Sequence, residues 1–195
     1  SAEGHSDRLL PNLVKSARMI IAIYTGYILS GTFLYMVFGM DWFDALNHSI
    51  AALSTGGFST RAESIGYYNS TAIEMVTVIL MLLGSTNFFV HLLLLKGKFK
   101  EFISHCEVRL MLFLLALFVP ILTVLLMNGV YSNVPVSLRA ALFQAVSALT
   151  TTGFQTVESF AAWTPAMMFL MILLMLIGGG AGSTAGGLKI YRVYV

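Results

Sequence analysis

The sequence has very few charged residues for its length. Asp, Glu, Lys and Arg make up 10% of the 195 residues, whereas hydrophobic residues make up 57% and the mean hydropathy is +0.84. A soluble domain carries roughly a quarter charged residues. So few charges cannot cover a water-facing surface, and we therefore expect most of the surface to face lipid.

Other common features are scarce as well. Cys106 is the only cysteine, which excludes an intramolecular disulfide framework. The formal net charge of +2 is too small to indicate nucleic-acid binding. Residues 1–14 are polar and mixed and show no removable signal peptide. Because the chain starts without Met and ends abruptly in a hydrophobic and basic run, we expect it to be part of a longer protein.

Four apolar segments are long enough to cross a bilayer, which requires about 20 apolar residues in a helix. They are Met19–Phe38, Ala72–Leu95, Leu110–Met127 and a fourth that starts near Pro165 and ends in glycines. Two shorter segments, Trp42–Leu53 and Val136–Leu149, cannot span a bilayer and are typical of re-entrant half-helices. The sequence therefore predicts an all-α polytopic membrane protein.

The basic residues predict the orientation of these segments. If the chain starts in the cytoplasm, only Arg61 and Arg139 lie on the outer side. The inner side then holds nine: Arg8, Lys15, Arg18, Lys96, Lys98, Lys100, Arg109, Lys189 and Arg192. This positive-inside bias predicts a cytoplasmic N-terminal segment at 1–18 and a basic cytoplasmic connector at 96–109.

A polar stretch between apolar segments occurs twice. Ala52–Thr60 reads ALSTGGFST, and ninety-six positions later Ala148–Thr156 reads ALTTTGFQT; we call these the first and second loop motifs. Between Ala45–Thr60 and Ala141–Thr156, eight of sixteen aligned positions are identical. An internal repeat predicts the same structural unit twice. The units are 19–95 and 110–195, each a membrane helix, a pore helix, an extended loop and a second membrane helix.

Each loop motif follows the carboxyl end of a half-helix, where the partial negative charge favours a cation. Extended backbone carbonyls cannot face lipid, because each would cost several kcal/mol there, so we expect them to line a water- or ion-filled path. Gly57 and Gly153 permit backbone conformations that align successive carbonyls. Coordination by oxygen alone suits a hard alkali cation. The alternative is that both motifs are simple turns between helices.

These residues resemble the Trk/Ktr/HKT superfamily of bacterial, fungal and plant potassium transporters over essentially the whole chain. The resemblance implies that the loop motifs are two of four selectivity-filter segments, and that the units correspond to repeats two and three. The implied K+-binding residues are Thr55, Gly56, Gly57, Phe58, Thr151, Thr152, Gly153 and Phe154. The resemblance also implies a preference for K+ over Na+, since both filter glycines are present and one of them is serine in the Na+-selective branch of the superfamily.

The stretch from 178 to 189, which we call the Gly-rich loop, is the most specific match. The resemblance implies an intramembrane gate below the filter, formed by Gly178, Gly179, Gly180, Gly182, Ser183, Thr184, Gly186, Gly187 and Lys189. Its six glycines disfavour a continuous helix by about 1 kcal/mol each relative to Ala. The alternatives are a helix-packing surface of small residues and, for Lys189, an ordinary basic residue at the inner membrane boundary.

The sequence shows no set of nucleophile, general base and general acid that could act together, so we expect a transporter and not an enzyme. We expect K+ as the transported ion and no organic cofactor. Two filter segments cannot encircle an ion, so the other two must come from the same subunit or from a second copy. The resemblance also implies a homodimer in the cell (inner) membrane that works with a cytosolic nucleotide-binding regulatory ring.

Three other functions stay open from the sequence. A two-pore-domain K+ channel subunit would form one pore from a dimer of such chains. Gly180–Ala185, GAGSTA, matches the relaxed dinucleotide fingerprint and would suit a membrane-bound nucleotide-dependent enzyme, although that fingerprint requires a preceding strand. The third is a purely structural membrane subunit.

Overall fold

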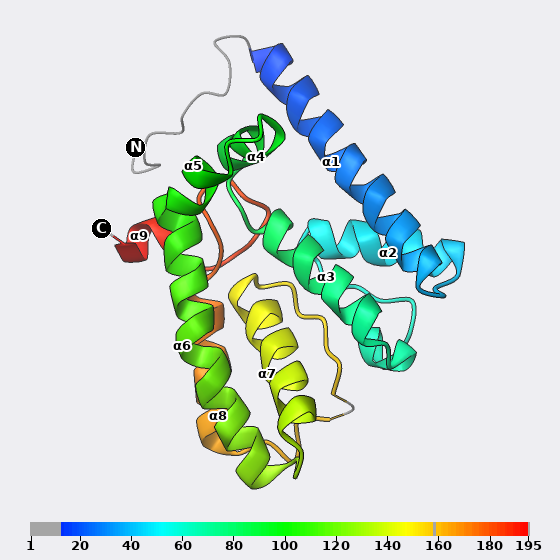
Figure 1. Cartoon of the computed structure of the whole chain (residues 1–195), viewed down its shortest axis with the longest axis vertical. Helices are drawn as coiled ribbons and strands as arrows, with labels where there is room; N and C mark the ends of the chain where they lie inside the picture. Colours follow the sequence, from blue (N-terminus) through cyan, green and yellow to red (C-terminus); the bar gives the residue numbers. More distant parts are fainter. Residues whose placement is uncertain (1–12, 158, 195) are drawn as a thin grey trace.

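The chain folds into packed helices, which include the two short helices that the sequence predicts as half-helices (Figure 1). The structure is a computed structural model, which describes residues 13–157 and 159–194. The regular elements are α1 (Leu13–Val37), α2 (Trp42–Leu53), η1 (Ser64–Tyr68), α3 (Thr71–Gly84), α4 (Phe88–Leu95), α5 (Phe99–Ser104), α6 (Cys106–Gly129), α7 (Val134–Leu149), α8 (Pro165–Ile177) and α9 (Ile190–Tyr194). All elements in the described ranges are helical, which confirms the all-α prediction. The part of the predicted cytoplasmic segment at 1–12 lies outside the described residues.

A tight connection turns α1 into the first half-helix, α2. Gly39 has a φ of +96°, and its N–H donates to the carbonyl of Met36 while the N–H of Met40 donates to that of Tyr35. This is the Schellman motif, which glycine adopts without steric cost. Asp41 then caps α2, because its carboxylate accepts the N–H of Phe43 at 3.2 Å. The chain thus reverses within four residues.

Close contacts join α1, α2 and α3 into one layer. At Gly31 a side chain would collide with Ser49 and Leu80, so α1 approaches both neighbours at this point. Ser49 donates its hydroxyl to the carbonyl of Ile28 at 2.9 Å. Further along α1, the buried hydroxyl of Tyr35 bonds that of Thr77 on α3 at 2.7 Å.

The segment Ala72–Leu95, predicted as one span, is two helices. Helix α3 ends at Gly84 and α4 begins at Phe88. The hydroxyls of Ser85 and Thr86 both donate to the carbonyl of Leu82, at 3.0 and 2.7 Å, which turns the chain out of the helix. The prediction of a continuous span was therefore wrong at residues 85–87.

The second unit places its half-helix in the interior. Helix α7 packs on α6, α8 and α3. Ten of its residues are buried: Ser137, Ala140, Ala141, Phe143, Gln144, Ala145, Val146, Ser147, Ala148 and Leu149. A helix with so many small and polar residues is stable at membrane depth because protein covers it on several sides.

The second membrane helix of each unit ends at an aligned glycine. Gly84 ends α3, and Gly178 follows the last residue of α8. The aligned sequences are ILMLLG and LLMLIG. After Gly84 the break is short, whereas after α8 the chain forms the Gly-rich loop before α9 begins at Ile190. The repeat therefore includes a broken second helix in both units.

Large apolar side chains cover the outward faces of α1 and α6. Exposed examples are Ile21, Leu29, Phe33, Leu112, Phe113 and Val124. By length and composition alone, Lys15–Val37 and Cys106–Gly129 can cross a membrane, and α3, α7 and α8 are apolar but shorter. These faces fit contact with lipid or with further helices.

Candidate functional site

The first loop motif begins with a Schellman motif that contains threonine where glycine is usual. The N–H of Thr55 donates to the carbonyl of Ala52 at 3.2 Å, and the N–H of Gly56 donates to that of Ala51 at 2.8 Å. Thr55 has a φ of +51°. A β-branched residue rarely adopts this left-handed conformation.

The second loop motif repeats this geometry. The N–H of Thr151 donates to the carbonyl of Ala148 at 3.0 Å, and the N–H of Thr152 donates to that of Ser147 at 2.9 Å. Thr151 has a φ of +56°. The sequence repeat is therefore also a repeat of an unfavourable backbone conformation.

Thr55 and Thr151, the two threonines with left-handed backbone conformations, lie where each loop motif leaves its half-helix. A non-glycine residue in this region costs about 1–3 kcal/mol, and such residues cluster at functional sites. At Gly39 the same turn is formed by glycine without that cost. The threonines at 55 and 151 therefore indicate that the hydroxyls are needed there.

The glycines of the two motifs have similar conformations but different surroundings. Gly57 has a φ of +68° and Gly153 a φ of +89°. A Cβ on Gly57 would collide with the carbonyl oxygen of Thr152, so the two motifs touch backbone to backbone here. A Cβ on Gly153 would meet no atom of the described residues within 4 Å. Gly57 is thus a packing position, whereas Gly153 faces open space.

The loop that follows the first motif also binds the second. The N–H of Gly66 donates to the carbonyl of Gln155 at 3.1 Å, and the N–H of Gln155 donates to the hydroxyl of Ser64 at 3.3 Å. Segments about 90 positions apart in the sequence therefore lie side by side. The structure brings the two sets of candidate filter residues together.

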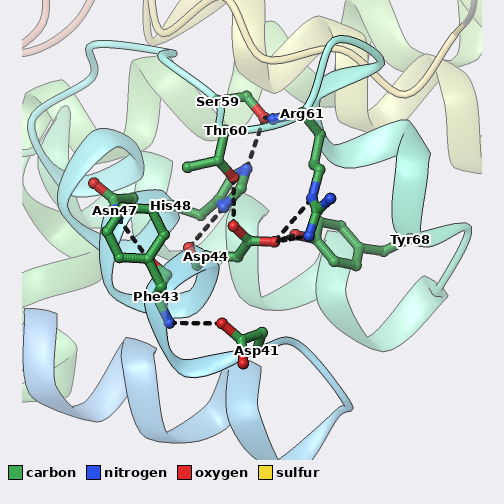
Figure 2. Close-up of polar contacts among 9 residues, drawn as sticks. All are labelled: Asp41, Phe43, Asp44, Asn47, His48, Ser59, Thr60, Arg61 and Tyr68. Carbon is green, nitrogen blue, oxygen red and sulfur yellow. Dashed lines mark hydrogen bonds and ion pairs between the residues drawn. The ribbon is translucent and has the colours of Figure 1, made fainter.

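A buried carboxylate anchors the outer limb of the first motif to its half-helix (Figure 2). The side chain of Asp44 on α2 is 6% exposed. One oxygen accepts the Thr60 hydroxyl at 2.7 Å. The other oxygen accepts hydrogen bonds from Nε and Nη2 of Arg61, at 2.9 and 2.7 Å, and from the Tyr68 hydroxyl at 2.7 Å. Every bond to this carboxylate comes from the last residue of the motif or from the chain that follows it.

His48 supports the same limb from α2. Its Nδ1 lies 2.7 Å from the carbonyl of Asp44 and therefore donates, which leaves Nε2 to accept the Ser59 hydroxyl at 2.8 Å. The imidazole also stacks on Phe154, with ring centroids 5.9 Å apart and 28° between the planes. A residue of the first unit thus packs directly on the second motif.

The second motif is anchored differently. Ser147 on α7 donates its hydroxyl to the carbonyl of Phe154 at 2.7 Å. Phe154 is 1% exposed, whereas the aligned Phe58 is 82% exposed. The two repeats therefore share a backbone but not the packing of their aromatic residue.

The Gly-rich loop contacts the inner end of the first motif through Thr184. The Thr184 hydroxyl donates to the carbonyls of Leu53, at 3.1 Å, and Gly84, at 2.9 Å. It also lies 3.3 Å from the hydroxyl of Thr55. One loop side chain therefore joins the end of α2, the end of α3 and the left-handed threonine.

The loop contacts the second motif as well. The N–H of Gly186 donates to the hydroxyl of Thr151 at 2.6 Å. Both left-handed threonines thus bond to the same loop, only two residues apart along it. The loop lies directly against the inner ends of both motifs.

Further loop contacts reach α6 and the break after α3. The N–H of Gly180 donates to the carbonyl of Ser85 at 2.8 Å, and the N–H of Ala181 donates to the carboxylate of Glu107 at 2.9 Å. The Lys189 ammonium donates to the carbonyl of Ala185, within the loop itself.

These contacts argue against a nucleotide at Gly180–Ala185. A phosphate-binding loop presents free backbone N–H groups after a strand. Here helix α8 precedes the loop, and the N–H groups of Gly180, Ala181 and Thr184 already donate to protein acceptors.

The candidate ligands for a cation in the two loop motifs are carbonyl and hydroxyl oxygen atoms. Within the described ranges, no group of three or more His, Cys, Asp and Glu side chains could hold a metal ion. Sequence reasoning missed Asp44 and Glu107, whose partners are distant in the chain. For Asp44 the signal was an acidic residue in an apolar segment with few other charges, whereas Glu107 lies in the charged connector at 96–109 and gave no such signal.

Residues 2–195 match the TrkH family profile, which is described as a cation transport protein. The chain belongs to this family, whose members are membrane transporters and not enzymes. This confirms the resemblance drawn from the two loop motifs and the Gly-rich loop, and the polytopic membrane fold.

Individual relatives share about a third of their residues with this chain. The Trk system potassium uptake protein TrkH of Halomonas elongata is 36% identical over 188 residues, which cover 95% of this chain and 39% of the relative. The Trk system potassium uptake protein TrkH of Escherichia coli K12 is 35% identical over 189 residues, covering 96% and 39%. An uncharacterised cation transporter of Methanocaldococcus jannaschii is 34% identical over 195 residues, covering 100% and 38%.

A solved structure has the same fold. The crystal structure of the potassium transporter TrkH from Vibrio parahaemolyticus matches with a TM-score of 0.88 and 33% identity, over 94% of this chain and 40% of that chain. The chain therefore spans about two fifths of the length of the relatives that it matches.

Proposed function

We propose that this chain supplies two of the four filter segments and the gate of a K+ uptake transporter. The observation that carries the proposal is the contact of both loop motifs with each other and, through Thr55 and Thr151, with the Gly-rich loop. The names of the relatives, potassium uptake proteins, supply the ion.

In this proposal, oxygen atoms of the two motifs replace the hydration shell of K+. The backbone carbonyls of Thr55–Phe58 and Thr151–Gly153 face the ion path, and the half-helices direct their carboxyl ends toward it. The carbonyl of Phe154 instead accepts the Ser147 hydroxyl and so holds the second motif in place. The cost of dehydrating K+ is offset because the oxygens are already held in place. The Asp44 cluster and the Ser147 bond provide that rigidity.

The Gly-rich loop closes the path on the inner side of the filter. Its contacts with the motifs are two bonds to threonine hydroxyls and one to the carbonyl of Leu53. Only these few bonds hold the glycine-containing loop against the motifs, so a state in which the loop has moved away from them is accessible at small energetic cost. Passage then depends on whether the loop occupies this position.

The complete pore requires two further filter segments, from the remaining repeats of the same subunit or from a second copy. The chain covers about 39% of its relatives, which leaves room in them for the missing repeats. We place the assembly as a homodimer in the inner membrane, with a cytoplasmic N-terminus and a cytosolic nucleotide-binding ring. The positive-inside bias supports the orientation.

Ion flux in liposomes tests the proposal. The complete transporter that contains this chain is reconstituted, and K+ uptake is measured with Na+ as competitor. We expect K+ to be preferred, and deletion of Gly180–Gly187 to raise flux several-fold. Equal uptake of Na+ and K+ would contradict the filter assignment, and unchanged flux after the deletion would contradict the gate.

A further inference from the structure

The carboxylate of Glu107 reaches into the Gly-rich loop from another helix. Glu107 lies in the first turn of α6 and is 5% exposed. One of its oxygens accepts the N–H of Ala181 at 2.9 Å. This bond joins positions 74 residues apart and attaches the first half of the loop (residues 178–183) to helix α6.

The second carboxylate oxygen faces the backbone of the same loop. Among the described residues it is buried and has no hydrogen-bond partner. A Cβ on Gly180 would lie 3.0 Å from it, so glycine at this position allows the loop to pack directly on the carboxylate. Acidic side chains are almost never fully buried unless paired. The Ala181 bond therefore accounts for a residue that packing alone would not favour.

The Glu107 bond differs in kind from the other bonds of the loop to neighbouring elements. Gly180 and Thr184 bond to backbone carbonyls, and Gly186 bonds to a threonine hydroxyl. Lys189, the charged residue of the loop, bonds within the loop. Glu107 thus attaches the first half of the loop (residues 178–183) through a side chain, which a substitution can remove.

We propose that Glu107 is a positioning residue that holds the Gly-rich loop in its closed place beneath the filter. The proposal rests on the gating function proposed above. Because a two-state equilibrium shifts by the difference in stability that a contact provides, loss of this bond increases the population of the displaced loop. The carboxylate acts on ion passage only through the loop.

Three variants of the complete transporter test this role by K+ flux in liposomes. Glu107→Ala removes the acceptor, and we expect flux to rise several-fold. Glu107→Gln keeps an oxygen that can accept the Ala181 N–H, and we expect flux to stay close to that of the unchanged protein. Glu101→Gln is the matched control, since Glu101 is an exposed acid six residues before Glu107 that pairs with Lys98.

Hydrogen exchange at the loop gives a second measurement that does not depend on flux. We expect the peptide containing Ala181 to exchange fastest in Glu107→Ala, more slowly in Glu107→Gln and slowest in the unchanged protein. If Glu107→Ala fails to fold, the exchange rate of Glu107→Gln relative to that of the unchanged protein still tests the proposal. Equal exchange in every folded variant overturns the proposal.

Deletion of Gly180–Gly187 separates this proposal from the gate itself. If the deletion raises flux and Glu107→Ala does not, the positioning role is wrong and the gate stands. If neither raises flux, both are wrong. If Glu107→Ala still raises flux after the loop has been deleted, Glu107 acts elsewhere and the proposal is overturned.

Discussion

Arg61 binds the carboxylate of Asp44 through two nitrogen atoms, at 2.9 and 2.7 Å. The Asp44 side chain is 6% exposed and that of Arg61 40% exposed, so the pair joins a buried position on α2 to the surface. The two residues flank the first loop motif. The ion pair therefore closes the motif into a ring that starts and ends at the half-helix.

Asp44→Asn should weaken this ring. Asn keeps one acceptor oxygen but loses the charge, while the partly exposed Arg61 can turn to water. We expect unfolding stability to fall by about 1–3 kcal/mol and the preference for K+ over Na+ to decrease. Thermal unfolding in detergent and competitive uptake measure the two effects. Glu63→Gln removes the same charge from an exposed position of the same loop and should change neither.

Substitution of the two motif glycines should have different consequences. Gly57→Ala places a methyl group on the carbonyl of Thr152, so we expect little folded protein. Gly153→Ala meets open space and carries only the left-handed backbone cost, about 1–2 kcal/mol. That variant should fold and show reduced K+ flux, because the methyl group projects toward the proposed path. Equal expression and flux for the two would contradict the assignment of Gly153 to the path.

Thr184→Val tests the contact between the loop and the filter. Valine keeps the shape of threonine but removes the hydroxyl that bonds to Leu53 and Gly84. We expect K+ flux to rise, since a buried bond of about 1 kcal/mol is lost in the closed position only. Ser183→Ala is the control, because the Ser183 hydroxyl bonds to Gly180 within the loop. A larger effect of the control would argue against the Thr184 contact.

The ion pair of Arg139 and Glu74 should make the two units interdependent. Arg139 on α7 binds both oxygens of Glu74 on α3, at 2.6 and 2.8 Å. Glu74 is 6% and Arg139 33% exposed, so Arg139→Met leaves a buried unpaired carboxylate. We expect it to lower unfolding stability by about 2 kcal/mol, and Glu74→Gln by about 1 kcal/mol. Additive losses in the double variant, measured by unfolding in detergent, would show that the pair is not coupled.

The repeated unit and the place of the half-helices could be predicted because they depend on local sequence. The length of Trp42–Leu53 excludes a span, and Asp41 marks its start. The aligned motifs predicted equivalent backbones, and the φ angles of Thr55 and Thr151 agree within a few degrees. The left-handed conformation itself could not be predicted, because threonine disfavours it and only the surrounding contacts maintain it.

The break after α3 shows where composition misleads. Ala72–Leu95 is apolar enough to predict one helix, and three polar residues do not end a helix by propensity alone. The Gly-rich loop explains why the helix ends there. The N–H of Gly180 donates to the carbonyl of Ser85, and the Thr184 hydroxyl donates to the carbonyl of Gly84. Those partners come from the other unit.

The sequence by itself determined a lipid-facing helical protein, its two repeats and the family, because hydropathy, segment length and motif identity can be read along the chain. The tertiary structure decided which of those residues act together. The contacts of Thr55 with Thr184, of Gly57 with Thr152 and of Glu107 with Ala181 join positions far apart in the chain. Such bonds form only after the helices have packed, because packing sets the distance and direction that a hydrogen bond requires.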